Sequence, residues 1–216
     1  MDNMIYNLFI SVFVPIFLMA ILVDKKSRLP IIFVLVGIFV SVFVAEINGL
    51  LLSALSFDML KMTIIVTPIT EEILKALPIL FYAIVISDKK ETLFTASMAT
   101  GIGFAILENA YYLLNGGENF RFMDAVVRAF GAGLMHGMCT LLVGVGISFV
   151  KKRRMVFGVG TFALLSTAIT YHAIYNMLIQ SKYSVAGAVL PIVTYIPFMI
   201  WRIRKGINSA QKREMV

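Results

Sequence analysis

The chain has 216 residues, of which 60% are hydrophobic and only 14% are charged, and its mean hydropathy is +0.91. A soluble domain of this length could not bury so much apolar surface, so the composition excludes an ordinary soluble fold and predicts an all-α integral membrane protein. The formal net charge of +7 does not indicate nucleic-acid binding. The basic residues form short clusters between apolar runs, which is the pattern of cytoplasmic loops beside anionic lipid.

Seven apolar runs divide the chain, and each is about 20 residues or longer, which is enough to cross a bilayer as a helix. They cover residues 4–23, 29–52, 60–87, 92–114, 125–150, 155–179 and 184–203. The first run predicts a retained anchor rather than a cleaved signal, because no Lys or Arg precedes it and no small-residue cleavage site follows it. We therefore expect one integral membrane domain over residues 1–216, multi-pass in the cell membrane, with about seven transmembrane helices.

The connectors between these runs alternate between basic and nearly neutral. Three connectors and the C-terminal tail carry basic clusters, namely Lys25, Lys26 and Arg28; Lys89 and Lys90; Lys151, Lys152, Arg153 and Arg154; and Arg202, Arg204, Lys205, Lys212 and Arg213. The other connectors hold single basic residues, namely Lys61, Arg121 and Lys182. Because cytoplasmic loops carry an excess of Lys and Arg, this alternation predicts an outer N-terminus and an inner C-terminus.

The third run contains charges that a membrane helix normally avoids. Between Pro68 and Pro78 it places Glu71, Glu72 and Lys75 near the middle of the bilayer. Each charge at that depth costs about 2.5–3.5 kcal/mol, so such residues normally face a protein interior or a wet cavity and mark a functional path. The two prolines free backbone carbonyls and kink the helix, which would admit water beside the carboxylates.

Three further runs carry polar side chains at a similar depth. They are Phe104, Glu108 and Asn109 in the fourth run, His136 in the fifth, and His172 and Asn176 in the sixth. With the expected orientation, these side chains and the acidic pair all lie at or outside the bilayer midplane. We therefore predict that four helices contribute to one polar layer near the outer face.

Helical spacing suggests how the acidic pair is oriented. Lys75 follows Glu71 by four residues, so the two share a helix face, while Glu72 points about 100° away from Glu71. We expect Glu71 to face His172, with Lys75 beneath it to fix its charge.

Two chemistries fit these residues. In the first, which needs no cofactor, Glu71 or Glu72 is the general base for a water molecule, and histidine and asparagine donate hydrogen bonds to an oxyanion. In the second, His136, His172 and Glu108 hold a Zn²⁺ ion as in catalytic two-His, one-Glu sites, and one member of the acidic pair is the base. The sequence contains no His-Glu-x-x-His zinc motif, so we favour the glutamate-type site.

Small residues recur in the fourth to sixth runs, and Gly133-x-x-x-Gly137 is a pattern that lets membrane helices approach closely. We interpret it as tight helix packing, and a groove for a partner helix is the alternative. Cys139 is the only cysteine, so no internal disulfide can form.

Four motifs stand in order between the third and sixth runs. They are Glu71-Glu72-Ile-Leu-Lys75, Gly103-Phe104-Ala-Ile-Leu-Glu108-Asn109, His136 in a glycine-rich run, and His172-x-x-x-Asn176. In these motifs the sequence resembles the PrsW family of intramembrane proteases, relatives of the CAAX prenyl endopeptidases and of bacteriocin-immunity membrane proteins. The CAAX enzymes typically carry a histidine where Glu108 stands, which favours the PrsW branch over the CAAX branch.

The resemblance implies an endopeptidase that cleaves a single-span membrane protein in the lipid bilayer, near the outer face. In one member of the family, this cut is the first cleavage of an anti-sigma factor during envelope-stress signalling, and the resemblance offers that role as an expectation for this chain. It also implies that Glu71 or Glu72 activates water and that the histidine and asparagine of the sixth run bind the water or the oxyanion. Glu108 and His136 would complete the site.

Two other functions use the same polar residues differently. A proton-coupled transporter would need polar residues that continue to the inner face, but the third run is apolar beyond Lys75. A non-catalytic helix-binding protein would use the glycine-lined groove. The chain also departs from the acidic, proline-containing loop found after the first span in many family members, because residues 24–30 read Asp-Lys-Lys-Ser-Arg-Leu-Pro, with three basic residues and one acidic residue.

Overall fold

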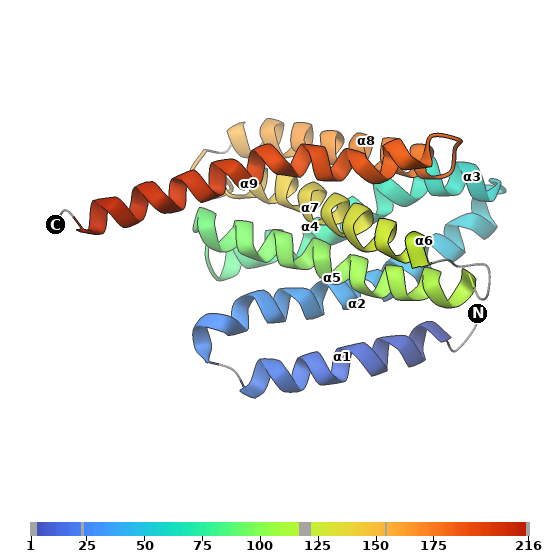
Figure 1. Ribbon diagram of the computed structural model, residues 1–216, viewed down its shortest axis with the longest axis horizontal. Coiled ribbons are helices and arrows are strands. Elements are labelled where there is room, and N and C mark those ends of the chain that lie inside the picture. The colour runs from blue at the N-terminus through green and yellow to red at the C-terminus, as the bar shows by residue number, and fades with distance from the viewer. Residues whose placement is uncertain (1–3, 23, 117–121, 154, 215–216) are drawn as a thin grey trace.

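The computed structural model describes residues 4–22, 24–116, 122–153 and 155–214, and these residues form helices and turns with no β-strand (Figure 1). Within the described residues, seven helical segments follow one another. They are α1 (Met4–Leu22); α2 (Lys25–Leu55); α3 (Met59–Lys61), a π-helix (Met62–Val66) and α4 (Thr67–Val85); α5 (Lys90–Gly116); α6 (Phe122–Val127), a π-helix (Arg128–Ala132) and α7 (Gly133–Ile147); a π-helix (Val156–Gly160) and α8 (Thr161–Ile179); and α9 (Ser184–Glu214). Each segment coincides with one predicted apolar run, which confirms the all-α membrane fold.

The clearest difference from the predicted runs is the length of α9, which continues to Glu214 instead of ending near residue 203. The extra turns are rich in Arg, Lys, Gln and Glu, which are good helix formers, so the helix continues although the apolar sequence has ended. In Figure 1 this end of α9 projects beyond the other helices.

Three segments of the described chain are long and apolar enough to cross a membrane by themselves, namely residues 27–55, 122–147 and 156–179. Helix α4 is not one of these apolar segments, because it carries three charged residues within its 19 residues. At the connectors, Lys152 Nζ lies 3.6 Å from Asp88 Oδ2, so two of the predicted inner loops share one end of the bundle. That end lies opposite α3 and α6 (Figure 1).

This arrangement agrees with the predicted alternation of connectors, while the number of helices that cross the membrane and their orientation stay predictions. Arg121 and Arg154, two of the basic residues used in that prediction, lie outside the described residues.

Glycines let α5 pack closely against the helices on both sides of it. On the α2 side, a Cβ atom added to Gly37 would lie 2.1 Å from Thr100 O, and one added to Gly103 would lie 2.1 Å from Val34 O. On the other side, a Cβ atom on Gly101 would lie 2.3 Å from a backbone oxygen of α7. Only residues without a side chain allow such backbone contacts, and α5 is thereby held between α2 and α7.

The predicted Gly133-x-x-x-Gly137 contact is only half correct. A Cβ atom on Gly137 would lie 2.7 Å from Met98 Sδ, so this glycine does face a tight interface. Gly133 has nothing within 4 Å of the position of an added Cβ, because it begins α7 on a side that faces open space. The close approach instead depends on Gly101, which belongs to no recognised glycine pair in the sequence.

Candidate active site

Helix α4 places three charged side chains in the protein interior. Glu71 is 3% exposed, and Glu72 and Lys75 have no exposed surface. Their burial agrees with the prediction that these charges face the interior rather than lipid. The helix enters this position from a π-helix, and Pro68 stands one residue after the junction.

The π-helix and Pro68 together leave one backbone carbonyl without an intrahelical partner. The N–H of Thr67 donates to Met62 O, five residues back, and the same spacing would pair Thr63 O with residue 68, which has no N–H. Asn176 Nδ2 donates to this oxygen at 3.0 Å. Asn176 therefore ties α8 to the segment that precedes α4, and this hydrogen bond does not bring it into contact with the acidic pair.

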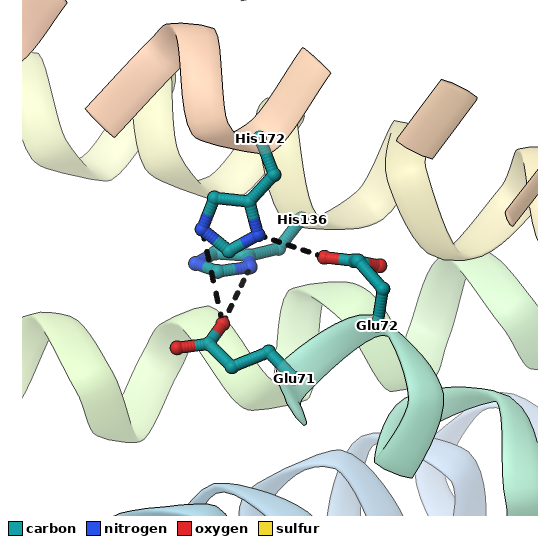
Figure 2. Close-up of side chains that lie close together, drawn as sticks. All are labelled: Glu71, Glu72, His136 and His172. Atoms are coloured by element: carbon teal, nitrogen blue, oxygen red, sulfur yellow. Dashed lines mark hydrogen bonds and ion pairs between the residues drawn. The ribbon is translucent and has the colours of Figure 1, made fainter. Parts of the chain in front are cut away.

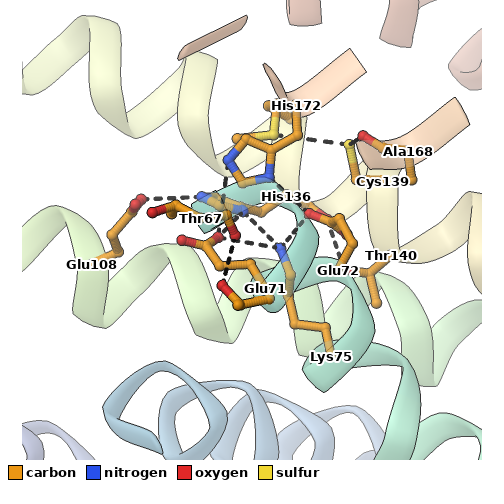
Figure 3. Close-up of polar contacts among 12 residues, drawn as sticks. Thr67, Glu71, Glu72, Lys75, Glu108, His136, Cys139, Thr140, Ala168 and His172 are labelled. Atoms are coloured by element: carbon orange, nitrogen blue, oxygen red, sulfur yellow. Dashed lines mark hydrogen bonds and ion pairs between the residues drawn. The ribbon is translucent and has the colours of Figure 1, made fainter. Parts of the chain in front are cut away.

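Glu72 is the carboxylate that contacts both Lys75 and His172. Its Oε1 accepts from Lys75 Nζ at 2.7 Å and from His172 Nδ1 at 2.9 Å (Figures 2 and 3). The expectation that Glu71 would face His172 above Lys75 is therefore only half correct, because Glu72 makes the direct hydrogen bonds to both residues and Glu71 faces them at longer distances. Lysines three and four residues after a glutamate can both reach it, so the rotation of α4 decides which pair forms.

Glu71 faces the same group at longer distances. Its Oε2 lies 3.7 Å from Lys75 Nζ, 3.7 Å from His136 Nδ1 and 3.9 Å from His172 Nε2. Each distance exceeds that of a direct hydrogen bond, and this buried oxygen has no hydrogen-bond partner among the described residues. Figure 2 shows the Glu71 carboxylate opposite the two imidazole rings.

The contacts of His136 define which ring nitrogen carries its proton. Nδ1 lies 2.9 Å from Lys75 Nζ, and Nε2 lies 3.0 Å from Glu108 Oε2. A lysine ammonium only donates and a carboxylate only accepts, so Nδ1 is the acceptor and Nε2–H is the donor. The same rule places a proton on the Nδ1 atom of His172, which faces Glu72, and leaves its Nε2 as an acceptor toward Glu71.

Phe104 forms the apolar wall beside these groups. The ring centroid of Phe104 lies 4.5 Å from Lys75 Nζ and 5.0 Å from the His136 ring centroid. The ring face attracts the ammonium and shields it from other partners. The predicted supporting residues Lys75 and Phe104 are therefore both in contact with the group.

Glu108 links the group to a residue that the sequence reasoning missed. Arg128 Nη2 donates to Glu108 Oε2 at 3.1 Å, and the guanidinium carbon lies 3.8 Å from the centroid of the Tyr112 ring. Arg128 lies inside the predicted run 125–150, so the rule that selected the acidic pair in the third run could have found it. Asn109 Nδ2 donates to the backbone oxygen of Arg128 at 3.2 Å and does not reach the acidic pair.

Two adjoining cavities reach this group from different sides. The α2 cavity has a volume of about 310 Å³ and is lined in part by Glu46, Asn48, Thr67, Glu71 and Glu108. The α8 cavity has a volume of about 300 Å³ and is lined in part by Glu108, Arg128, His136, Asn176 and Gln180. Glu72 and His172 line neither cavity, so Glu71 is the member of the acidic pair that is accessible from a cavity.

Four side chains of the described chain form a group that could hold a metal ion. Glu71, Glu72, His136 and His172 each offer one ligand atom, and these atoms lie within 4.8 Å of one another. Two carboxylates and two imidazoles are ligand types that suit zinc. The predicted zinc set of His136, His172 and Glu108 is therefore not the set that the fold brings together, because Glu108 lies behind His136 on its Nε2 side.

Lys75 prevents this ligand set from fitting a metal as it stands. Its ammonium already contacts Glu72 Oε1 and His136 Nδ1, so a metal bound through these two atoms would have to displace it. An ammonium among the ligands also repels a divalent cation. The residues present thus form a site whose central cation is a lysine.

The fold and the site together define a helical membrane protein with a buried group of glutamates and histidines that opens onto internal cavities. Residues 25–202 match the family described as PrsW family intramembrane metalloprotease, and the chain belongs to this family. It is therefore an intramembrane peptidase, as the four motifs predicted. A protein of Clostridioides difficile (strain 630) named Protease PrsW is 26% identical over 235 residues, which cover 95% of this chain and 94% of that protein. No solved structure shows a significant match.

Proposed function

We propose that this protein is an intramembrane endopeptidase that hydrolyses a peptide bond of a single-span membrane protein near the outer membrane face, with Glu71 as the general base. One observation carries the assignment of the base. Each glutamate has a buried Oε2 atom without a hydrogen-bond partner in the described chain, but only Glu71 has access to the α2 cavity, whereas Glu72 lines neither cavity and its Oε1 already accepts from Lys75 and His172.

The gap between Glu71 and His172 suits a single water molecule. Glu71 Oε2 and His172 Nε2 are both acceptors and lie 3.9 Å apart, a separation that one water can bridge by donating a hydrogen to each. Its oxygen lone pair then faces away from both residues and toward a peptide carbonyl in the α2 cavity. Glu72 holds the His172 ring in this orientation through the Nδ1–H bond.

The hydrolysis then follows from these positions. Glu71 takes a proton from the water as the water oxygen bonds to the carbonyl carbon, and it later passes that proton to the amide nitrogen as the C–N bond breaks. Asn176 uses one hydrogen of Nδ2 for Thr63 O, and its second is available to the oxyanion from the α8 cavity. No step requires a metal ion.

The cavities also favour a substrate whose backbone is unwound at the cut. A peptide bond in a helix has its carbonyl engaged, so the segment must lose its helical hydrogen bonds before attack, and those groups then need new partners in the membrane. The α2 cavity provides such partners in Asn48, Thr63 and Thr67. Both cavities extend to residues at the end of the bundle that is predicted to face outward, such as Met59 and Tyr112, which supports a cut near the outer face.

The test is cleavage of a tethered reporter by the purified protein in proteoliposomes, with an anti-sigma factor as one of the single-span substrates offered. We expect Glu71→Gln to lower the cleavage rate by about 100-fold or more, the usual contribution of a general base. Glu91→Gln, which alters a glutamate at the exposed start of α5, is the matched control and should cleave normally. Cleavage should persist with a metal chelator present. Undiminished cleavage by a folded Glu71→Gln protein would contradict the proposal.

A further inference from the structure

We propose that Lys75 is the resident cation of the site. Its ammonium takes the position that a divalent metal would need and keeps the wild-type protein from binding one, so that replacing Lys75 creates a metal site. The inference rests on the geometry of the four-residue group. It deepens the proposed function because it explains how the site would hydrolyse a peptide without a metal.

The contacts of Lys75 are those of a cation that is already coordinated. Nζ has no exposed surface and lies 2.7 Å from Glu72 Oε1, 2.9 Å from His136 Nδ1 and 3.7 Å from Glu71 Oε2, and the face of Phe104 covers it at 4.5 Å. Figure 3 shows the lysine nitrogen between the glutamates and the His136 ring. Three of the four residues that could bind a metal therefore already face this ammonium.

The lone pair of His136 makes the two cations mutually exclusive. An imidazole nitrogen has one lone pair, and that of Nδ1 points to Lys75 Nζ, while Nε2 carries the proton donated to Glu108. A metal that used all four ligands would have to take the Nδ1 lone pair from Lys75. The lysine has no exposed route by which to withdraw, since its whole side chain is buried.

Charge leads to the same conclusion. Glu71 and Glu72 supply two negative charges, of which the ammonium compensates one. A divalent ion beside the ammonium would bring three positive charges against two carboxylates, with mutual repulsion at short range in a poorly polarisable interior. Without the ammonium, two carboxylates, the Nδ1 lone pair of His136 and the Nε2 lone pair of His172 would be left to bind one divalent ion.

The experiment compares Lys75→Met with wild type by zinc titration and by metal analysis after removal of free metal. Methionine keeps the length of the side chain without its charge. We expect wild type to retain almost no zinc and Lys75→Met to retain about one ion per chain, with zinc affinity roughly 100-fold tighter or more. Lys61→Met is the matched control, because Lys61 lies on the same helical segment, is exposed and pairs with Asp58, and it should resemble wild type.

Each result decides for or against the inference. Stoichiometric zinc in wild type, or a folded Lys75→Met protein that binds none, overturns it. If Lys75→Met unfolds without metal, zinc-dependent folding is the supporting result, since binding energy then becomes folding energy. If Lys75→Met does not fold even with zinc, the titration is repeated with Lys75→Ala purified in the presence of zinc. Failure of the Lys75→Ala protein to retain zinc counts against the inference.

The same measurements separate this inference from the proposed function. Metal-free wild type that cleaves no substrate would remove the peptidase proposal and leave the role of Lys75 intact. Zinc-loaded wild type with chelator-sensitive cleavage would leave the peptidase activity, but it would contradict the metal-free mechanism and remove the role of Lys75.

Discussion

The contact between α5 and α7 at Gly101 controls the position of His136. A Cβ atom on Gly101 would lie 2.3 Å from His136 O and 2.6 Å from His136 C, whereas such atoms essentially never approach below 3.0 Å. Both atoms belong to the backbone of α7, so no side-chain rotation relieves the clash. Gly101→Ala must therefore separate the two helices by at least about 0.7 Å.

That separation should lower both stability and activity. Overpacking of this kind costs about 1–3 kcal/mol, which corresponds to a fall in melting temperature of about 2–12 °C for a chain of this size. The 3.0 Å bond from His136 to Glu108 spans the same interface and would lengthen, and a displacement near 1 Å in a catalytic group can cost about 100-fold in rate.

The assays for Gly101→Ala are thermal unfolding in detergent and reporter cleavage. Gly133→Ala is the matched control, because Gly133 lies one turn before His136 and an added methyl group meets nothing within 4 Å. It should leave activity unchanged and stabilise the helix by up to about 1 kcal/mol. A Gly101→Ala protein that melts as high as Gly133→Ala would refute the reasoning.

Two further expectations concern contacts around the group. Asn176→Ala should cost about 1 kcal/mol, because Thr63 O loses its donor, and the loss should shrink when combined with Pro68→Ala, which restores an N–H at the right spacing. If the changes in unfolding free energy of the two substitutions are simply additive in the double variant, Thr63 O is not the carbonyl that Pro68 leaves without a partner. Arg128→Met should cost about 1–3 kcal/mol by leaving the Glu108 carboxylate without its cation, and Glu108→Gln should recover part of that loss in a double-mutant cycle.

The positions of the helices could be predicted because an apolar run of bilayer length has few other stable structures. The sequence also predicts that the polar residues gather in one layer, again because of the cost of polar groups in a membrane. A charge in the membrane is costly unless it meets another polar group, so Glu72, Lys75, His136 and His172 were expected to meet, and their contacts join α4, α7 and α8.

The pairing inside the layer could not be predicted from spacing. Glu71 and Glu72 stand four and three residues before Lys75, and both spacings permit contact. The π-helix and Pro68 set the rotation of α4, and this rotation brings the carboxylate of Glu72 closer to Lys75 than that of Glu71. Asn176 was unpredictable for the same reason, since its partner carbonyl becomes available only when the chain forms that π-helix.

Among the described residues, one of the three glutamates of the site has no cation in direct contact with its carboxylate. Glu72 contacts Lys75 and Glu108 contacts Arg128, while Glu71 has no cation within hydrogen-bonding distance among the described residues. If Glu71 served only the fold, a neutral residue of the same shape would serve better. We therefore expect Glu71→Gln to raise the free energy of unfolding by about 0.5–2 kcal/mol while it lowers the cleavage rate by about 100-fold or more, the trade-off typical of functional groups. Glu72→Gln should instead destabilise the protein by about 3–5 kcal/mol, because it leaves the Lys75 ammonium buried without its closest partner. Equal destabilisation by the two substitutions, measured by denaturation in detergent, would show that both glutamates are structural.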